Sequence, residues 1–244
     1  MGKLKKVCFD MISSEYRHEL KYICTESQLA CVKNRISTVM QIDPHTGADG
    51  IYTIRSLYFD DYGNTCFYEN ENGTDPREKF RIRIYNHDAA HIKLELKRKE
   101  HAKTRKISCT ITEKLCRDIM DRKALDINAV DSPVYRKFCL QIQTRLLQPR
   151  VIVEYDRIPY IYQNGNVRVT FDKNVRSGIS CNQFLEEYVP MRPIMPGGHH
   201  VLEVKYDAYI PDYIYRGVQI ENLQQTAYSK YYLCRKYNLG GAHS

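Results

Sequence analysis

Charged residues recur at alternate positions in one extended segment after another, and this pattern constrains the fold more than any other feature of the sequence. Residues two apart in a strand point to the same face of a sheet. One face therefore collects charges such as Arg81 and Arg83, while the residues between them are apolar. A solvated face also alternates, but it more often uses Thr, Ser and Gln. Further charges that share a face within their own segments are Glu19 with Lys21, Lys93 with Glu95, Lys97 and Lys99, Arg168 with Asp172, and Glu203 with Lys205.

Eight segments have the β-branched and aromatic content and the two-residue period of strands. Turn residues separate them, and Asn164-Gly165-Asn166 predicts a hairpin. We therefore expect a mainly β (α+β) chain with about eight antiparallel strands in a closed barrel or a sandwich, and with connecting and C-terminal helices. The expected strands cover residues 15–24, 51–60, 79–87, 91–99, 104–111, 150–162, 167–173 and 200–207.

Helix signals are fewer and predict four helices, at about 26–40, 113–121, 133–147 and 223–237. The first follows a capping-box pattern, Thr25 with Gln28 three residues later. The third begins at Ser132-Pro133, a cap followed by proline in the first turn. The sequence contains no repeat and no Pro/Ser-rich linker. We therefore expect a single domain over residues 1–244, with its core at about 15–237.

Composition excludes several classes of protein. The chain is 43% hydrophobic and 27% charged, which is globular rather than disordered. It has no run of about 18 apolar residues, which excludes a transmembrane helix, and no apolar signal-peptide segment follows its first lysines. Its nine cysteines form no C-x-x-C pair, which disfavours a zinc or redox motif. We expect a cytoplasmic protein with reduced thiols, whose net charge of +8 favours polyanionic partners.

A barrel closed with this charged face inward would be lined by about eight cations and two or three carboxylates. Buried like charges are costly, so such a lumen must hold water and, in use, an anionic ligand. Arginines two apart suit bidentate contacts to phosphate oxygens, and lysines act as point charges. The carboxylates suit Mn²⁺ or Mg²⁺ accompanying the phosphates. The pattern therefore predicts a tunnel for a phosphate chain.

Seven motifs, in order over about residues 15–237, resemble the VTC domain, the polyphosphate-polymerase branch of the triphosphate tunnel metalloenzymes. The resemblance implies an eight-stranded antiparallel barrel that forms a tunnel. Each motif alone is weak, and their order makes the resemblance specific. The motifs are Arg17-His18-Glu19-Leu20-Lys21-Tyr22, Phe80-Arg81-Ile82-Arg83, Glu95-Leu96-Lys97-Arg98-Lys99, Tyr155-Asp156-Arg157, Val167-Arg168-Val169-Thr170-Phe171-Asp172, Val201-Leu202-Glu203-Val204-Lys205 and Tyr228-Ser229-Lys230-Tyr231.

The resemblance also implies roles for single residues. Glu203, helped by Glu19, would hold the metal ion, and Lys230 on the last helix would close on the phosphates. Contacts to a nucleoside triphosphate or to the phosphate chain would come from Lys21, Arg81, Arg83, Lys97, Arg157 and Arg168. Further phosphate contacts are expected from Lys99, Lys106, Tyr155, Lys205 and Ser229.

Two departures from the wider superfamily bear on function. Arg17 stands where its E-x-E-x-K motif has the first glutamate, which removes a metal ligand and speaks against the triphosphatase and cyclase branches. The short stretch before the first motif leaves no room for a regulatory SPX domain, so we expect neither that domain nor membrane helices in this chain. His199-His200 before Glu203 could extend a metal site, but their position after Pro196-Gly197-Gly198 favours the end of a loop.

The favoured function is transfer of the γ-phosphate of ATP to a growing polyphosphate chain, with release of ADP. A phosphate acceptor is already ionised at pH 7, so this reaction needs no general base. The alternatives are a triphosphatase of the same fold and a non-catalytic polyphosphate-binding module, and carboxylates such as Glu95 among the cations speak against the latter. We expect ATP and inorganic polyphosphate or triphosphate as partners, and no nucleic acid.

Overall fold

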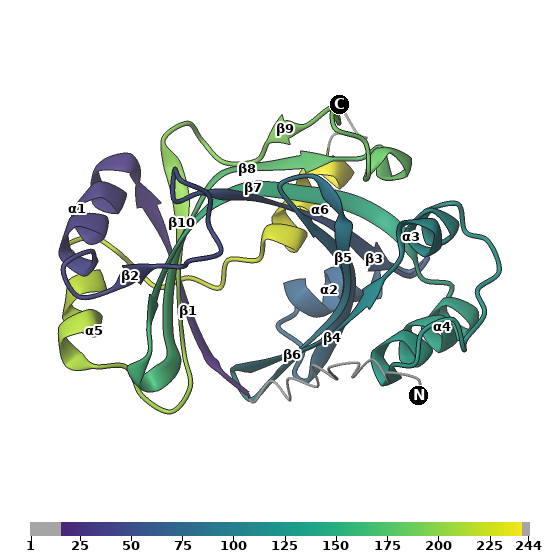
Figure 1. The fold of residues 1–244 in the computed structure, drawn as a ribbon, viewed down its shortest axis with the longest axis horizontal. Coiled ribbons are helices and arrows are strands. Elements are labelled where there is room, and N and C mark those ends of the chain that lie inside the picture. The colour runs from purple at the N-terminus through teal and green to yellow at the C-terminus, as the bar shows by residue number, and fades with distance from the viewer. Residues whose placement is uncertain (1–15, 241–244) are drawn as a thin grey trace, which may run out of the picture.

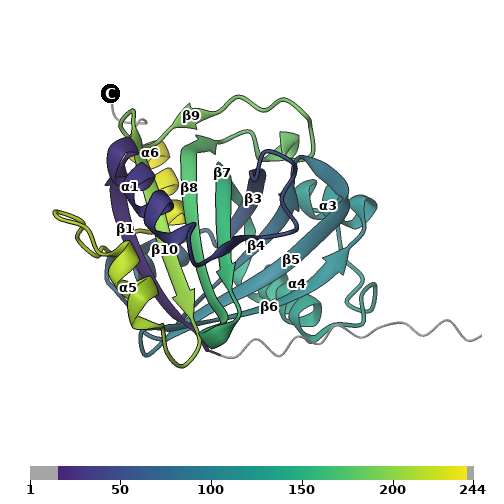
Figure 2. The same ribbon diagram turned by 60° about the vertical axis from the view of Figure 1, so that its left-hand side comes forward.

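The computed structural model describes residues 16–240, and its centre is one strongly curled antiparallel sheet. The main strands follow the order β1-β10-β8-β7-β3-β4-β5-β6, as Figure 2 shows. Short strands extend the sheet where β2 pairs with β7 and β9 pairs with β8. The bounds are β1 (His18–Thr25), β2 (Gln41–Ile42), β3 (Tyr52–Asp60), β4 (Arg77–Tyr85), β5 (Asp88–Glu100), β6 (Lys103–Ile111), β7 (Gln148–Tyr162), β8 (Val167–Gly178), β9 (Arg192–Pro193) and β10 (His199–Tyr206).

The two ends of this strand order, β1 and β6, meet just before β1 begins. The backbone N–H of Arg17 donates to the carbonyl of Thr104 over 3.0 Å, and Thr104 returns a bond of the same length. Further along, the Thr104 hydroxyl donates to Glu19 over 3.3 Å. We call this junction the seam. The mainly β fold class and all eight expected strands are confirmed, and their ends differ from the prediction by at most five residues, at the end of β8.

Among residues 16–240 six helices lie around the sheet, and most of them cover its outer face (Figure 1). The outer side chains of β1, β8 and β10 pack against α1 and α5, through residues such as Val32 and Ile214. On the other side, α3 and α4 cover β3, β4 and β5, with Phe138 among Phe59 and Phe80. The bounds are α1 (Glu26–Ile36), α2 (Thr65–Glu71), α3 (Glu113–Met120), α4 (Pro133–Arg145), α5 (Asp212–Val218) and α6 (Lys230–Gly240).

Helix α6, together with the neighbouring α2, packs instead against the inner face of the sheet, and Cys66 of α2 lies in the same buried cluster. Tyr231 and Cys234 are buried among inward-pointing residues of β7, β8 and β10, such as Val153, Val175 and Val201. The phenol of Tyr231 also donates to the buried carboxylate of Asp60 over 2.6 Å. The helix therefore fills one end of the barrel and carries its own first residues toward the charged interior.

The predicted start of this last helix, at residue 223, was wrong. Residues before Lys230 are extended, because Gln225 forms a bridge with Tyr22 and the N–H of Thr226 donates to the carbonyl of Lys21 over 2.8 Å. The local pattern is apolar enough for a helix, but pairing with β1 satisfies the backbone instead. Helices α2 and α5 were not predicted, since both are short and lack a clear apolar period.

The sequence signals for the start of the first helix and for the hairpin predicted the structure correctly. The capping box at Thr25 is present, and the side-chain oxygen of Gln28 accepts a hydrogen bond from the Thr25 N–H over 2.9 Å. The helix that it starts ends at Ile36, short of the expected residue 40. The hairpin at residues 164–166 connects β7 to β8 as predicted, with Gly165 at φ 76°. Within residues 16–240 no helix is both long and apolar enough to cross a membrane.

Candidate functional site

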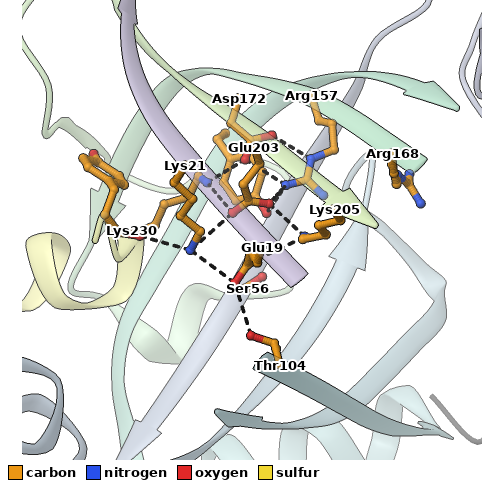
Figure 3. A network of polar contacts seen from close by, with 12 residues as sticks. Glu19, Lys21, Ser56, Thr104, Arg157, Arg168, Asp172, Glu203, Lys205 and Lys230 are labelled. Carbon is orange, nitrogen blue, oxygen red and sulfur yellow. Dashed lines mark hydrogen bonds and ion pairs between the residues drawn. The ribbon is translucent and has the colours of Figure 1, made fainter. Parts of the chain in front are cut away.

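Glu203 on β10 lies at the centre of the inner charged face, and only 6% of its side chain is exposed. Four cations from four elements surround it (Figure 3). Burial alone would raise the pKa of this carboxyl, but the nearby cations, above all Lys205, hold it well below its usual value. Glu203 is therefore ionised. The distances to its carboxylate oxygens are 2.8 Å from Lys205, 3.5 Å from Lys21, 3.5 Å from Arg157 and 3.6 Å from Lys230.

Asp172 on β8 fixes two of these cations in place. It is fully buried and accepts a fork of two bonds from Arg157, over 2.6 and 2.8 Å. Its second oxygen also lies 2.6 Å from the Lys230 ammonium at the start of α6. Bidentate arginine–carboxylate pairs are geometrically specific. Asp172 therefore orients the Arg157 guanidinium and connects the last helix to the barrel.

Glu19 on β1 connects the strands on both sides of the seam. Its carboxylate lies 2.9 Å from Lys97 on β5 and 3.5 Å from Lys205 on β10. Lys21 lies between the two central carboxylates, 3.6 Å from Glu19 and 3.5 Å from Glu203, and donates to the carbonyl of Tyr228. Burial raises the pKa of Glu19, but Lys21 and Lys97 outweigh it and keep the pKa well below normal.

The two arginines of β4 are held by a third buried carboxylate, Glu95. Arg81 contacts Glu95 over 2.7 Å and donates to the Tyr58 hydroxyl over 2.9 Å. Arg83 donates to the Ser56 hydroxyl over 3.1 Å and lies 3.8 Å from Glu95. Because each guanidinium is held at two or more of its nitrogens, its remaining N–H bonds are oriented before any ligand binds.

Two cavities adjoin along this charged face. The inner cavity, of about 70 Å³, has eight cationic side chains and two carboxylates in its wall. The outer cavity, of about 380 Å³, extends toward α2 and the extended segment before α6. Five residues line both cavities, which places the junction between them at Glu19, Lys21, Lys79, Lys97 and Ser229. The cations of the inner cavity are Lys21, Lys79, Arg81, Arg83, Lys97, Arg157, Lys205 and Lys230.

The structure brings most of the expected site residues together, but not all. Arg168 bonds to Asp43 and to the Tyr52 hydroxyl, both over 2.8 Å, and lies apart from the central network in Figure 3. Lys106 contacts Glu95 over 3.0 Å and has 44% of its side chain exposed. Lys99 lines the outer cavity only. The remaining expected residues, Tyr155 and Ser229 among them, line the inner cavity.

Sequence reasoning gave no role to several residues of this site, Asp172 and Lys79 among them. Asp172 was recognised as part of the charged face but received no role, and its contacts with Arg157 and Lys230 depend on the barrel closing. Lys79 was not selected, although it stands two residues before Arg81 and four before Arg83. That Lys-x-Arg-x-Arg spacing was the available signal, because all three side chains share one strand face.

The donors present fit a divalent cation held jointly with a ligand. Glu203 and Glu19 are buried, ionised carboxylates on either side of Lys21. Among residues 16–240 no group of three or more His, Cys, Asp or Glu side chains is arranged to hold a metal by itself. Mg²⁺ commonly binds through one or two carboxylates plus substrate phosphates, which is the set available here. His200 is not part of it, since its ring contacts Glu26 on α1.

The fold and the site together define a class: a curled antiparallel barrel whose interior is lined by arginines and lysines with a few carboxylates among them. The family model of the VTC domain matches residues 16–238, and the chain belongs to this family. Family and site together indicate a protein that handles phosphoryl compounds.

Solved structures provide further likenesses. The PH1819 protein from Pyrococcus horikoshii OT3 has a TM-score of 0.47 and 15% identity, covering 91% of this chain and 99% of its own. A Bacillus halodurans protein described as a candidate adenylate cyclase has a TM-score of 0.47 and 13% identity, covering 80% of this chain and 82% of its own. No curated protein matches the sequence.

Proposed function

We propose that the protein transfers the γ-phosphate of ATP to the end of a growing inorganic polyphosphate chain and releases ADP. The observation that carries this proposal is the inner cavity, where eight cationic side chains face two carboxylates. Even when Asp172 and Glu95 behind the wall are counted, the eight cations exceed the four carboxylates by four, and such an excess is stable only with water or an anion among them. A chain of phosphates supplies one negative charge or more per unit along its whole length.

The arrangement supports catalysis by electrostatic stabilisation and positioning. In phosphoryl transfer, charge in the transition state is spread over the equatorial oxygens of the moving group. Arg81, Arg83 and Arg157 present guanidinium groups already fixed by carboxylates, so little reorganisation is needed when charge develops. Lys230 enters from α6, opposite these strands, and encloses the phosphates from the remaining side.

The acceptor in this reaction is a terminal phosphate, which is already ionised at neutral pH. No histidine lies among the described residues that line the inner cavity, and none is required to remove a proton. Glu203 and Glu19 would hold Mn²⁺ or Mg²⁺, which when bound would neutralise charge on the reacting phosphates. The protein's residues bind and align the two anionic reactants, whose mutual repulsion otherwise opposes the reaction.

The test is a single incubation of purified protein with ATP and either Mn²⁺ or Mg²⁺. ADP, free phosphate and long-chain polyphosphate are measured together, with Lys93→Met as the matched control because Lys93 is exposed on the same strand face as Lys97. ADP with polyphosphate and little free phosphate supports the polymerase. Free phosphate without chains would identify a triphosphatase, and tight binding without turnover a binding module.

A further inference from the structure

The ladder between β4 and β5 changes character along its length. Arg81 lies opposite Glu95, a cation paired with a carboxylate, and on the far side of this rung Arg83 faces the exposed Lys93. The next rung outward pairs Lys79 with Lys97, and the one beyond pairs Arg77 with Lys99. Like charges directly opposite each other in an antiparallel pair destabilise the sheet. Two successive cation–cation rungs therefore indicate a position where an external anion supplies the missing charge.

Lys79 is the most distinctive residue of this ladder. Lys21, Lys97, Lys205 and Lys230 each lie within 4.0 Å of a carboxylate, at distances of 3.5, 2.9, 2.8 and 2.6 Å respectively. Among the described residues, Lys79 makes no such ion pair. Its ammonium lies 3.4 Å from the Ser229 hydroxyl and 5.1 Å from the centre of the Tyr231 ring. Burial lowers its pKa well below normal, and the charges of Lys97 and Lys21 lower it further.

The position of Lys79 relates the two cavities. It lines both of them, whereas Arg77 and Lys99 line only the outer one. Among the acidic residues of the outer cavity, Glu19 pairs with Lys97 on this ladder over 2.9 Å, but none in the described part of the chain forms an ion pair with Lys79. Glu78 extends away to Lys137 and Arg98, at 2.6 and 3.4 Å, and burial raises the pKa of Glu69. A ligand that extends from the inner cavity outward must therefore pass the ammonium group of Lys79.

We propose that Lys79 extends the phosphate site into the outer cavity and thereby makes the protein prefer linear polyphosphate to inorganic triphosphate. This inference rests on the proposed function and specifies its chain-binding part. The cations of the inner cavity other than Lys79 already suffice for a short anion. A longer chain gains the contacts at the junction and beyond, and these contacts begin at Lys79.

The test compares the affinity of two probes, inorganic triphosphate and a longer linear polyphosphate of defined length, by calorimetry without metal. Lys79→Met is expected to weaken binding of the long chain about tenfold or more, the loss expected for one hydrogen bond to a charged group. Triphosphate binding should fall by a smaller factor. Lys79→Arg should retain most of the preference, and Lys93→Met should change neither affinity. Thermal unfolding of each variant checks that it remains folded.

The outcomes separate the two proposals. Equal losses for both probes, or no loss for either, overturn the role of Lys79 and leave the proposed function standing. If Lys79→Met fails to fold, the comparison is made with Lys79→Gln, and the same criteria apply. A wild-type protein that binds neither probe more tightly than it binds sulfate refutes the proposed function, and this inference with it.

Discussion

Replacing Asp172 by Asn provides a quantitative test of how the central charges hold each other. The substitution keeps the shape of the side chain but leaves Arg157 and Lys230 without the carboxylate that lies 2.6 to 2.8 Å from both. Removing one partner from a buried ion pair costs about 3–5 kcal/mol. For a chain of this size each kcal/mol lowers the midpoint of thermal unfolding by about 2–4 °C. We therefore expect a fall of roughly 6–20 °C.

A ligand should recover part of this loss, because phosphates supply the negative charge that was removed. Saturating triphosphate, at about 100 times its dissociation constant, stabilises a folded protein by about 2.7 kcal/mol. The assay is thermal unfolding with and without triphosphate, with Asp131→Asn as control, since its ion pair with Arg136 is exposed and contributes about 0–1 kcal/mol. A fall no larger than that of the control, or no recovery with triphosphate, would refute the account of the central network given above.

Three further expectations concern charge and local structure. Glu203→Gln should abolish turnover with either metal. Triphosphate binding without metal should stay equal or tighten, because the substitution removes a negative charge from the cavity. Normal turnover would contradict the metal assignment. Burial lowers the pKa of Lys97 to about 7. The unfolded chain then binds more protons than the folded one between about pH 7 and 10, so stability should rise with pH across this range. Lys97→Met should show a smaller rise in urea unfolding at pH 7 and pH 9, and an identical rise would contradict the assigned burial. Thr25→Ala should lower unfolding stability by about 1 kcal/mol through loss of the helix cap, and an unchanged midpoint would contradict it.

The charged face could be predicted because alternate residues of a strand always point to the same face of the sheet. Once Arg81 and Arg83 are known to lie on a strand, their shared direction follows, and so does that of Glu203 and Lys205. The barrel was expected from the eight strand segments and from closing the sheet with this charged face inward. The inner cavity confirms the expected lining of about eight cations and two or three carboxylates.

Partners across the barrel were not predictable in this way. The contact of Asp172 with Lys230 joins β8 to a helix that begins 58 residues later, and no local pattern encodes it. Arg168 lies on the same face of its strand as Asp172, yet its guanidinium bonds to Asp43 and Tyr52 and lies away from the central network. Which cation reaches the centre depends on neighbours from distant strands, and these are fixed only by register and closure.

The seam between β1 and β6 restricts how such a protein can change its ligand preference. Glu19 both faces the tunnel and joins the two sides of the barrel, through Lys97 and Thr104. A substitution there that retunes the ligand site also weakens the closure of the sheet. The outer cavity has more freedom, because residues such as Lys99 and Gln225 line it without holding the sheet edges together. Divergence among related proteins should therefore accumulate at the outer cavity, while the carboxylate of Glu19 is retained for mechanical as well as chemical reasons.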